Sequence, residues 1–69
     1  MSKQTKISSL FTKVDLLKQE IYSSQLSLLQ VQEQENPKPK DIHHYQDIID
    51  LKQEELESVK SAIEALKNN

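Results

Sequence analysis

The chain has 69 residues and a net charge of −2, and it contains two prolines, no glycine and no cysteine. This length allows one small domain at most, and a domain of this size buries only about 60% of its unfolded surface, so it usually needs a partner or a covalent link. The lack of cysteine excludes disulfides, and the lack of glycine argues against the many tight turns of a β-rich or α/β fold.

A first helix is predicted over about residues 5–34, which are rich in good helix formers. Apolar residues recur there at alternating spacings of three and four, the pattern of a coiled-coil seam. The seam positions are Ile7, Leu10, Val14, Leu17, Ile21, Ser24, Leu28 and Val31, of which only Ser24 is polar.

Two prolines interrupt the helical pattern in the segment 35–40, at Pro37 and Pro39. Proline cannot occupy a helix interior, and it moves the residue before it out of the helical region. We therefore expect a loop here, with Pro39 or Asp41 opening the second helix.

The second helix is predicted over about residues 40–67, and it carries a matching seam. Its positions are Ile42, Tyr45, Ile49, Lys52, Leu56, Val59, Ile63 and Leu66, of which only Lys52 is charged. When the chain folds back at the loop, the two seams meet layer by layer, with Val31 opposite Ile42, Ile21 opposite Lys52, Leu17 opposite Leu56 and Ile7 opposite Leu66. The sequence thus predicts an all-α fold, a two-helix antiparallel hairpin formed as a single domain over residues 1–69.

Further apolar residues lie outside the seam on both predicted helices. On the first helix they are Phe11, Tyr22, Leu26 and Leu29, and on the second they are Ile48, Leu51, Ala62 and Ala65, with Leu16 placed loosely beside the second set. An antiparallel pair puts the two sets on opposite sides of the hairpin. Phe11 and Ile48 lie nearest the seam, and they are also open to the interpretation that they only widen the contact between the helices. A hairpin with this much apolar surface in water needs a second copy or a different protein, so the candidate partner-binding residues are Phe11, Tyr22, Leu26, Leu29, Ile48 and Leu51.

The sequence offers no candidate catalytic, cofactor-binding or metal-binding residues, and we expect a binding protein rather than an enzyme. His43 and His44 are adjacent and point about 100° apart on a helix, so they cannot share a metal ion. His43 with Asp47 would supply only two of the three or four ligands that zinc requires. A hairpin also has no cavity in which a catalytic triad could assemble.

The charge pattern disfavours nucleic acid as a partner, because the second half of the chain is acidic and no arginine is present. No apolar run approaches the roughly 20 residues of a membrane span, and the first residues lack the apolar segment of a secretory signal. The expectation is a soluble protein that stays in the compartment where it is made.

Three short motifs resemble a known family. The segment Asn36-Pro37-Lys38-Pro39-Lys40-Asp41, followed by His44-Tyr45-Gln46 and by Leu56-Glu57-Ser58, resembles the small type III secretion co-chaperones of the YscE/SsaE kind. The resemblance covers roughly residues 36–66. It implies a cytoplasmic helical hairpin that stabilises a second, helical-repeat chaperone, the two together keeping a secreted needle or filament subunit soluble and unpolymerised before export.

Two alternatives stay open at this point. Needle subunits themselves have an Asn-Pro-x-x-Pro turn followed by Tyr-Gln, but the turn here is one residue shorter, and the chain ends in Lys67-Asn68-Asn69 instead of an apolar tail. A self-assembling, needle-like structural subunit is therefore the second interpretation. A homodimeric four-helix-bundle regulator is the third, and it would need a basic stripe to bind nucleic acid.

Overall fold

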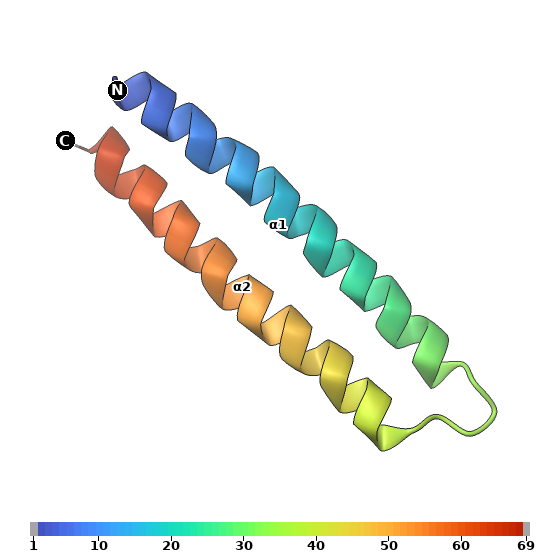
Figure 1. Ribbon diagram of the computed structural model, residues 1–69. Helices are drawn as coiled ribbons and strands as arrows, with labels where there is room; N and C mark the ends of the chain where they lie inside the picture. Colours follow the sequence, from blue (N-terminus) through green and yellow to red (C-terminus); the bar gives the residue numbers. More distant parts are fainter. Residues whose placement is uncertain (1, 69) are drawn as a thin grey trace.

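The computed structural model describes residues 2–68, which form two long helices joined by a short loop. Helix α1 spans Lys3–Gln32 and helix α2 spans Pro39–Lys67. The helices lie antiparallel and side by side, so that both chain ends lie at one end of the molecule and the loop at the other (Figure 1). The molecule measures 52 × 14 × 14 Å, the elongated shape of a single pair of helices. The predicted all-α hairpin is confirmed.

Helix α1 begins and ends two residues earlier than the sequence pattern predicts. The Ser2 hydroxyl accepts a hydrogen bond from the Thr5 backbone N–H at 3.2 Å, so Ser2 serves as the N-cap and the helix starts at Lys3 rather than at residue 5. At the other end, the Glu33 N–H bonds to the Leu29 carbonyl, and the chain then turns away. Residues 33 and 34 therefore belong to the loop and not to α1.

The loop and the start of α2 follow from the two prolines. Lys38 is extended, with ψ of 122°, as expected for a residue that precedes a proline. Pro39 is the first residue of α2, where its missing N–H removes no helical hydrogen bond. No residue between positions 2 and 68 has a positive φ, so the described turn closes without needing glycine.

The core of the hairpin is the predicted seam. Every predicted seam position is buried or half-buried. The contiguous buried cluster consists of Val14, Leu17, Ile21, Ile49, Leu56, Val59 and Ile63, with Leu10 and Leu28 packed against it. The most buried of these is Leu17, which is 3% exposed.

The two polar seam positions, Ser24 and Lys52, lie toward the loop from this cluster's centre. Val31 is also buried, but it stands apart from the contiguous cluster. The seam is thus entirely apolar in the half near the chain ends and contains two polar residues in the half near the loop.

Candidate partner-binding surfaces

Three exposed apolar side chains lie together on the outer side of α1, in the half of the hairpin nearer the loop. Tyr22 is 63% exposed, Leu26 is 43% exposed and Leu29 is 52% exposed. Spacings of four and three residues place them on one helix face. We call this set, Tyr22, Leu26 and Leu29, the tyrosine face. It is the largest grouping of exposed large apolar side chains that one helix face carries in residues 2–68.

A hollow of about 560 Å³ opens beside the tyrosine face, along the line where α1 and α2 meet. Tyr22 and Lys18 line it from α1, and Gln53 and Glu57 line it from α2. The buried seam residues Ile21 and Leu56 also border it. A side chain inserted beside Tyr22 would therefore contact both helices and reach apolar atoms of the core.

Phe11 is not part of the tyrosine face. It lies three helical turns from Tyr22, about 16 Å along the axis. Its ring is 46% exposed, and the Lys67 ammonium lies 5.6 Å from the ring centroid, a cation–π contact between the two ends of the chain. The structure therefore gives Phe11 a partner within the hairpin, while leaving nearly half of the side chain open.

The predicted apolar set on α2 divides into a half-buried and an exposed part. Ile48 is half-buried, which favours the interpretation that it widens the contact between the helices. Leu51 is 65% exposed, the largest exposed fraction among the exposed large apolar residues. Ala62 and Ala65 are exposed as well. Leu16 of α1, 56% exposed, borders the same hollow as Ile48, which joins the two helices on this side of the hairpin.

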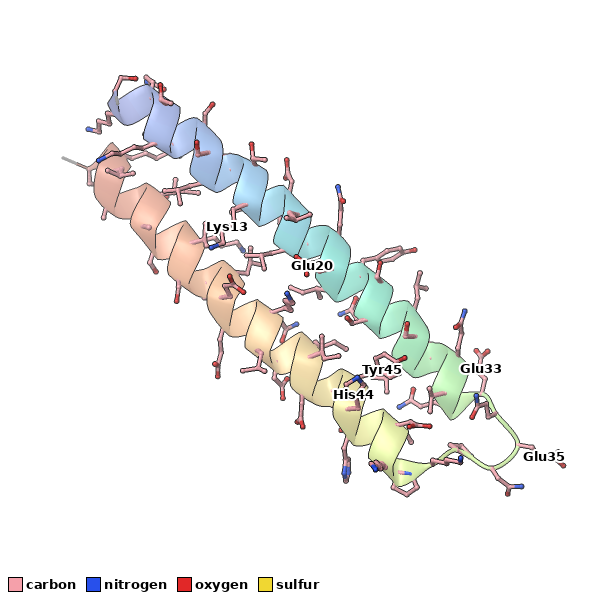
Figure 2. The ribbon with its side chains drawn as sticks, in the orientation of Figure 1. Lys13, Glu20, Glu33, Glu35, His44 and Tyr45 are labelled. Carbon is pink, nitrogen blue, oxygen red and sulfur yellow. The ribbon has the colours of Figure 1, made fainter. Side chains whose placement is uncertain are left out.

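Charged residues along the helix–helix boundary form two ion pairs between α1 and α2. Lys52 Nζ donates to Glu20 Oε2 at 2.7 Å, and Lys13 Nζ lies 3.4 Å from Glu55 Oε1. Figure 2 shows Lys13 and Glu20 on the part of α1 that faces α2. The hydrogen bond that Lys52 donates to Glu20 raises the pKa of Lys52 above its ordinary value. Desolvation opposes this shift, and the negative charges of Glu20 and Glu55 add to it.

Glu20 is the ion-pair partner of Lys52, and the sequence pattern did not predict it. The signal was present, because Glu20 directly precedes Ile21, and the predicted register places Ile21 opposite Lys52. The observed contact agrees with that register. Lys52 reaches out of the seam along its aliphatic stem to this carboxylate, so its charge is compensated at the edge of the core.

One of the two adjacent histidines, His44, contacts an aromatic ring. The His44 ring meets the Tyr45 ring edge-on, with centroids 5.2 Å apart, and Tyr45 itself occupies a half-buried seam position (Figure 2). Within residues 2–68, no three or more histidine or carboxylate side chains gather as a group that could hold a metal ion.

No helix of the described chain is both long enough and apolar enough to cross a membrane. Comparison of the chain with protein-family models, with curated proteins and with solved structures gives no match.

Proposed function

We propose that this hairpin is a protein-binding co-chaperone of the cytoplasm. It docks on a helical-repeat partner chaperone and helps to keep a type III secretion needle or filament subunit soluble and unpolymerised before export. The hairpin performs no chemistry in this account, and its contribution is to cover apolar surface on the partner and to have its own apolar surface covered.

The observation that carries the proposal is the exposure of the tyrosine face. Three large apolar side chains, 43% to 63% exposed, lie on one face of a helix whose other face already fills the seam. Residues at such spacings are the anchors by which one helix fits into a groove between partner helices. The hollow beside Tyr22 offers the partner a matching recess, and tyrosine is favoured in such places because it buries a large area while its hydroxyl stays hydrogen-bonded.

The identity of the partner rests on the resemblance in residues 36–66. The proline-marked turn and the Tyr45-Gln46 pair at the start of the second helix are features of the small type III secretion co-chaperones. Exposed apolar side chains on the hairpin support a partner of this kind because a helical-repeat protein presents the concave apolar grooves that they fit.

A needle-like structural subunit is the second candidate function. The observation that favours it is the presence of exposed leucines on both sides of the hairpin, Leu26 and Leu29 on one and Leu16 and Leu51 on the other. Different patches on opposite sides can generate an open, head-to-tail polymer, whereas a chaperone needs one docking side.

The test is a pull-down of the full chain from its native cells, read by mass spectrometry, together with light scattering of the purified chain. The proposal expects a helical-repeat protein and a small secreted subunit to be captured, and a purified chain that remains small. Long polymers in the scattering experiment would favour the needle-like subunit, and capture of nucleic acid would favour a four-helix-bundle regulator.

A further inference from the structure

Two ion pairs join the helices on one side of the seam. Their residues, which we call the charged quartet, are Lys13, Glu20, Lys52 and Glu55. Lys52 Nζ donates to Glu20 Oε2 at 2.7 Å, and Lys13 Nζ lies 3.4 Å from Glu55 Oε1. The four side chains are 31% to 52% exposed, and ion pairs this open to water stabilise a fold only slightly. Stability alone therefore does not account for a lysine in the seam, where an apolar residue would bury more apolar surface.

The apolar seam by itself permits more than one alignment of the two helices. Its positions repeat every seven residues, so α2 can move along α1 by one repeat, about 10.5 Å, and seam residues still face seam residues. In the observed alignment Ser24 lies opposite Ile49, in agreement with the two ion pairs. We call the alignment that places Leu56 opposite Ser24 loop-shifted, because α2 has moved toward the loop, and the alignment that places Ile42 there end-shifted. In either one, the seam residues near one end of each helix lose their partners, and the middle of the loop moves by about one helical turn.

The charged quartet opposes the loop-shifted alignment. In the observed alignment Glu55 lies beside Lys13 of α1. A displacement of one repeat exchanges Lys13 for Glu20, which then faces Glu55 as a like charge. Lys52 loses Glu20 at the same time and has the uncharged Ser27 in its place, so no carboxylate of α1 compensates its charge in the seam. Both ion pairs are lost in this alignment, and a repulsion takes the place of one of them.

The charged quartet opposes the end-shifted alignment as well. Lys13 then takes the position beside Lys52, so that two ammonium groups meet at the seam. Glu20 comes opposite Asp41, which is a second contact of like charges. The remaining carboxylate of the quartet gains an ion pair with Lys6, and this offsets only one of the two repulsions. The end-shifted alignment is therefore also disfavoured by charge.

We propose that the charged quartet selects the register of the hairpin, stabilising the observed alignment through two ion pairs and excluding both shifted alignments through like charges. The other side of the seam cannot make this choice, because it holds lysine and glutamine without a carboxylate at the corresponding central positions, which are Lys18, Gln25, Gln53 and Lys60. The inference concerns the free chain and does not rest on the proposed docking function.

The register also determines the shape of the hairpin surface, because the hollow beside Tyr22 has walls from both helices. Tyr22 lines it from α1, and Gln53 and Glu57 line it from α2. A shift of α2 by about 10.5 Å carries both α2 residues away from Tyr22. A chain with mixed registers would therefore present this hollow on only a fraction of its molecules, and the charged quartet prevents that mixture.

The test redistributes the charges of the quartet without changing the net charge. The half swap, Lys13→Glu with Glu55→Lys, keeps two ion pairs in the observed alignment. It also gives each shifted alignment an ion pair in place of a repulsion, because the new lysine meets Glu20 in the loop-shifted alignment and the new glutamate meets Lys52 in the end-shifted one. The full swap adds Glu20→Lys and Lys52→Glu, which restores like charges in both shifted alignments. The full swap is therefore the matched control.

Cysteine pairs that share Ser24→Cys report the register, since the native chain has no cysteine. Ile49→Cys as the second cysteine reports the observed alignment, Leu56→Cys the loop-shifted one and Ile42→Cys the end-shifted one. In the observed alignment the last two positions are displaced from Ser24 by about 10 Å along the helix, beyond the reach of a disulfide. Each pair is placed in the wild-type, half-swap and full-swap chains and oxidised in a glutathione buffer at low protein concentration. Mass spectrometry then measures the fraction of monomer that carries an internal disulfide.

The half swap should form the two shifted disulfides, relative to the Ser24–Ile49 disulfide, on the order of tenfold more readily than the wild type, because each shifted alignment exchanges a repulsion for an ion pair. The full swap should match the wild type, and circular dichroism should show all three chains helical. Equal shifted disulfides in the wild type and the half swap would overturn the proposal, as would a full swap that shifts as readily as the half swap. A half swap that loses its helicity would also contradict it, because two ion pairs of the observed alignment are retained.

Discussion

The half of the hairpin near the chain ends and the half near the loop share one heptad pattern but bury it differently. In the half near the chain ends, all seam residues are apolar; Val14, Leu17, Leu56, Val59 and Ile63 are buried, and Ile7, Leu10 and Leu66 are half-buried. In the half near the loop, the seam contains the polar residues Ser24 and Lys52, both half-buried, and only Ile21, Val31 and Ile49 are buried. The exposed side chains of the tyrosine face and Leu51 lie in this second half. The comparison teaches that the hairpin buries more of its seam in the half near the chain ends and exposes more of its large apolar side chains in the half near the loop, although Phe11 and Leu16 are exposed in the first half.

Truncation of a seam leucine in each half should show the largest difference. Leu17→Ala should lower the free energy of unfolding by about 2–5 kcal/mol, the usual cost of removing a buried leucine. Leu28→Ala, at a half-buried position near the loop, should cost clearly less. Denaturant unfolding followed by circular dichroism measures both. Equal costs would mean that the two halves stabilise the hairpin to the same degree.

Disulfide formation across the seam tests the register in which α1 and α2 pair. Cysteines at Leu17 and Leu56 face each other and should oxidise readily, stabilising the hairpin by roughly 2–4 kcal/mol. Cysteines at Leu17 and Val59 are one layer out of register and should not oxidise comparably. The disulfide is assayed by the shift of the oxidised chain on a non-reducing gel, and preferential oxidation of the second pair would refute the register.

Much of this architecture could be predicted from the sequence because burial of a two-helix seam is a local, periodic property. The hairpin and its seam positions follow from the spacing of apolar residues, and the loop follows from the two prolines. The start of α1 was misplaced because the Ser2 cap depends on a single hydrogen bond, and the partner of Lys52 was missed because Glu20 lies outside the apolar pattern. The choice between apolar stripes for the partner does not follow from periodicity, since Tyr22 and Leu51 are equally regular in spacing and both are exposed.

Removal of the charge from the half of the seam near the loop should have a moderate effect. Lys52→Leu should raise the melting temperature by a few degrees, because a leucine fills the layer opposite Ile21. The ion pair with Glu20 that is lost is exposed by about a third on both sides and contributes little in water. Differential scanning calorimetry measures the change. A lower melting temperature would show that the pair with Glu20 stabilises the hairpin more than an apolar layer does.

The smallest effect concerns pH. The pKa of Lys52 is raised in the folded state, so the stabilisation from this pair is fully present below the ordinary lysine pKa and is lost as the pH rises through the folded-state value, in the alkaline range. The difference in stability between the wild type and Glu20→Gln should therefore shrink from neutral pH to about pH 11. Denaturation midpoints of the two proteins at matched pH give this difference, and a constant gap would contradict the coupling.

Binding through the tyrosine face is tested most directly by the double variant Leu26→Ser, Leu29→Ser against the partner captured from native cells. About half of each leucine side chain is covered in the free hairpin, so the partner gains roughly half of the ~1.5–3 kcal/mol that full burial of each would supply. The account predicts unchanged helical circular dichroism and a loss of affinity between about tenfold and a hundredfold by titration calorimetry. The matched control Leu51→Ser should bind like the wild type. Unchanged affinity of the double variant, or loss of affinity only in Leu51→Ser, would contradict the assignment of the tyrosine face as the docking surface.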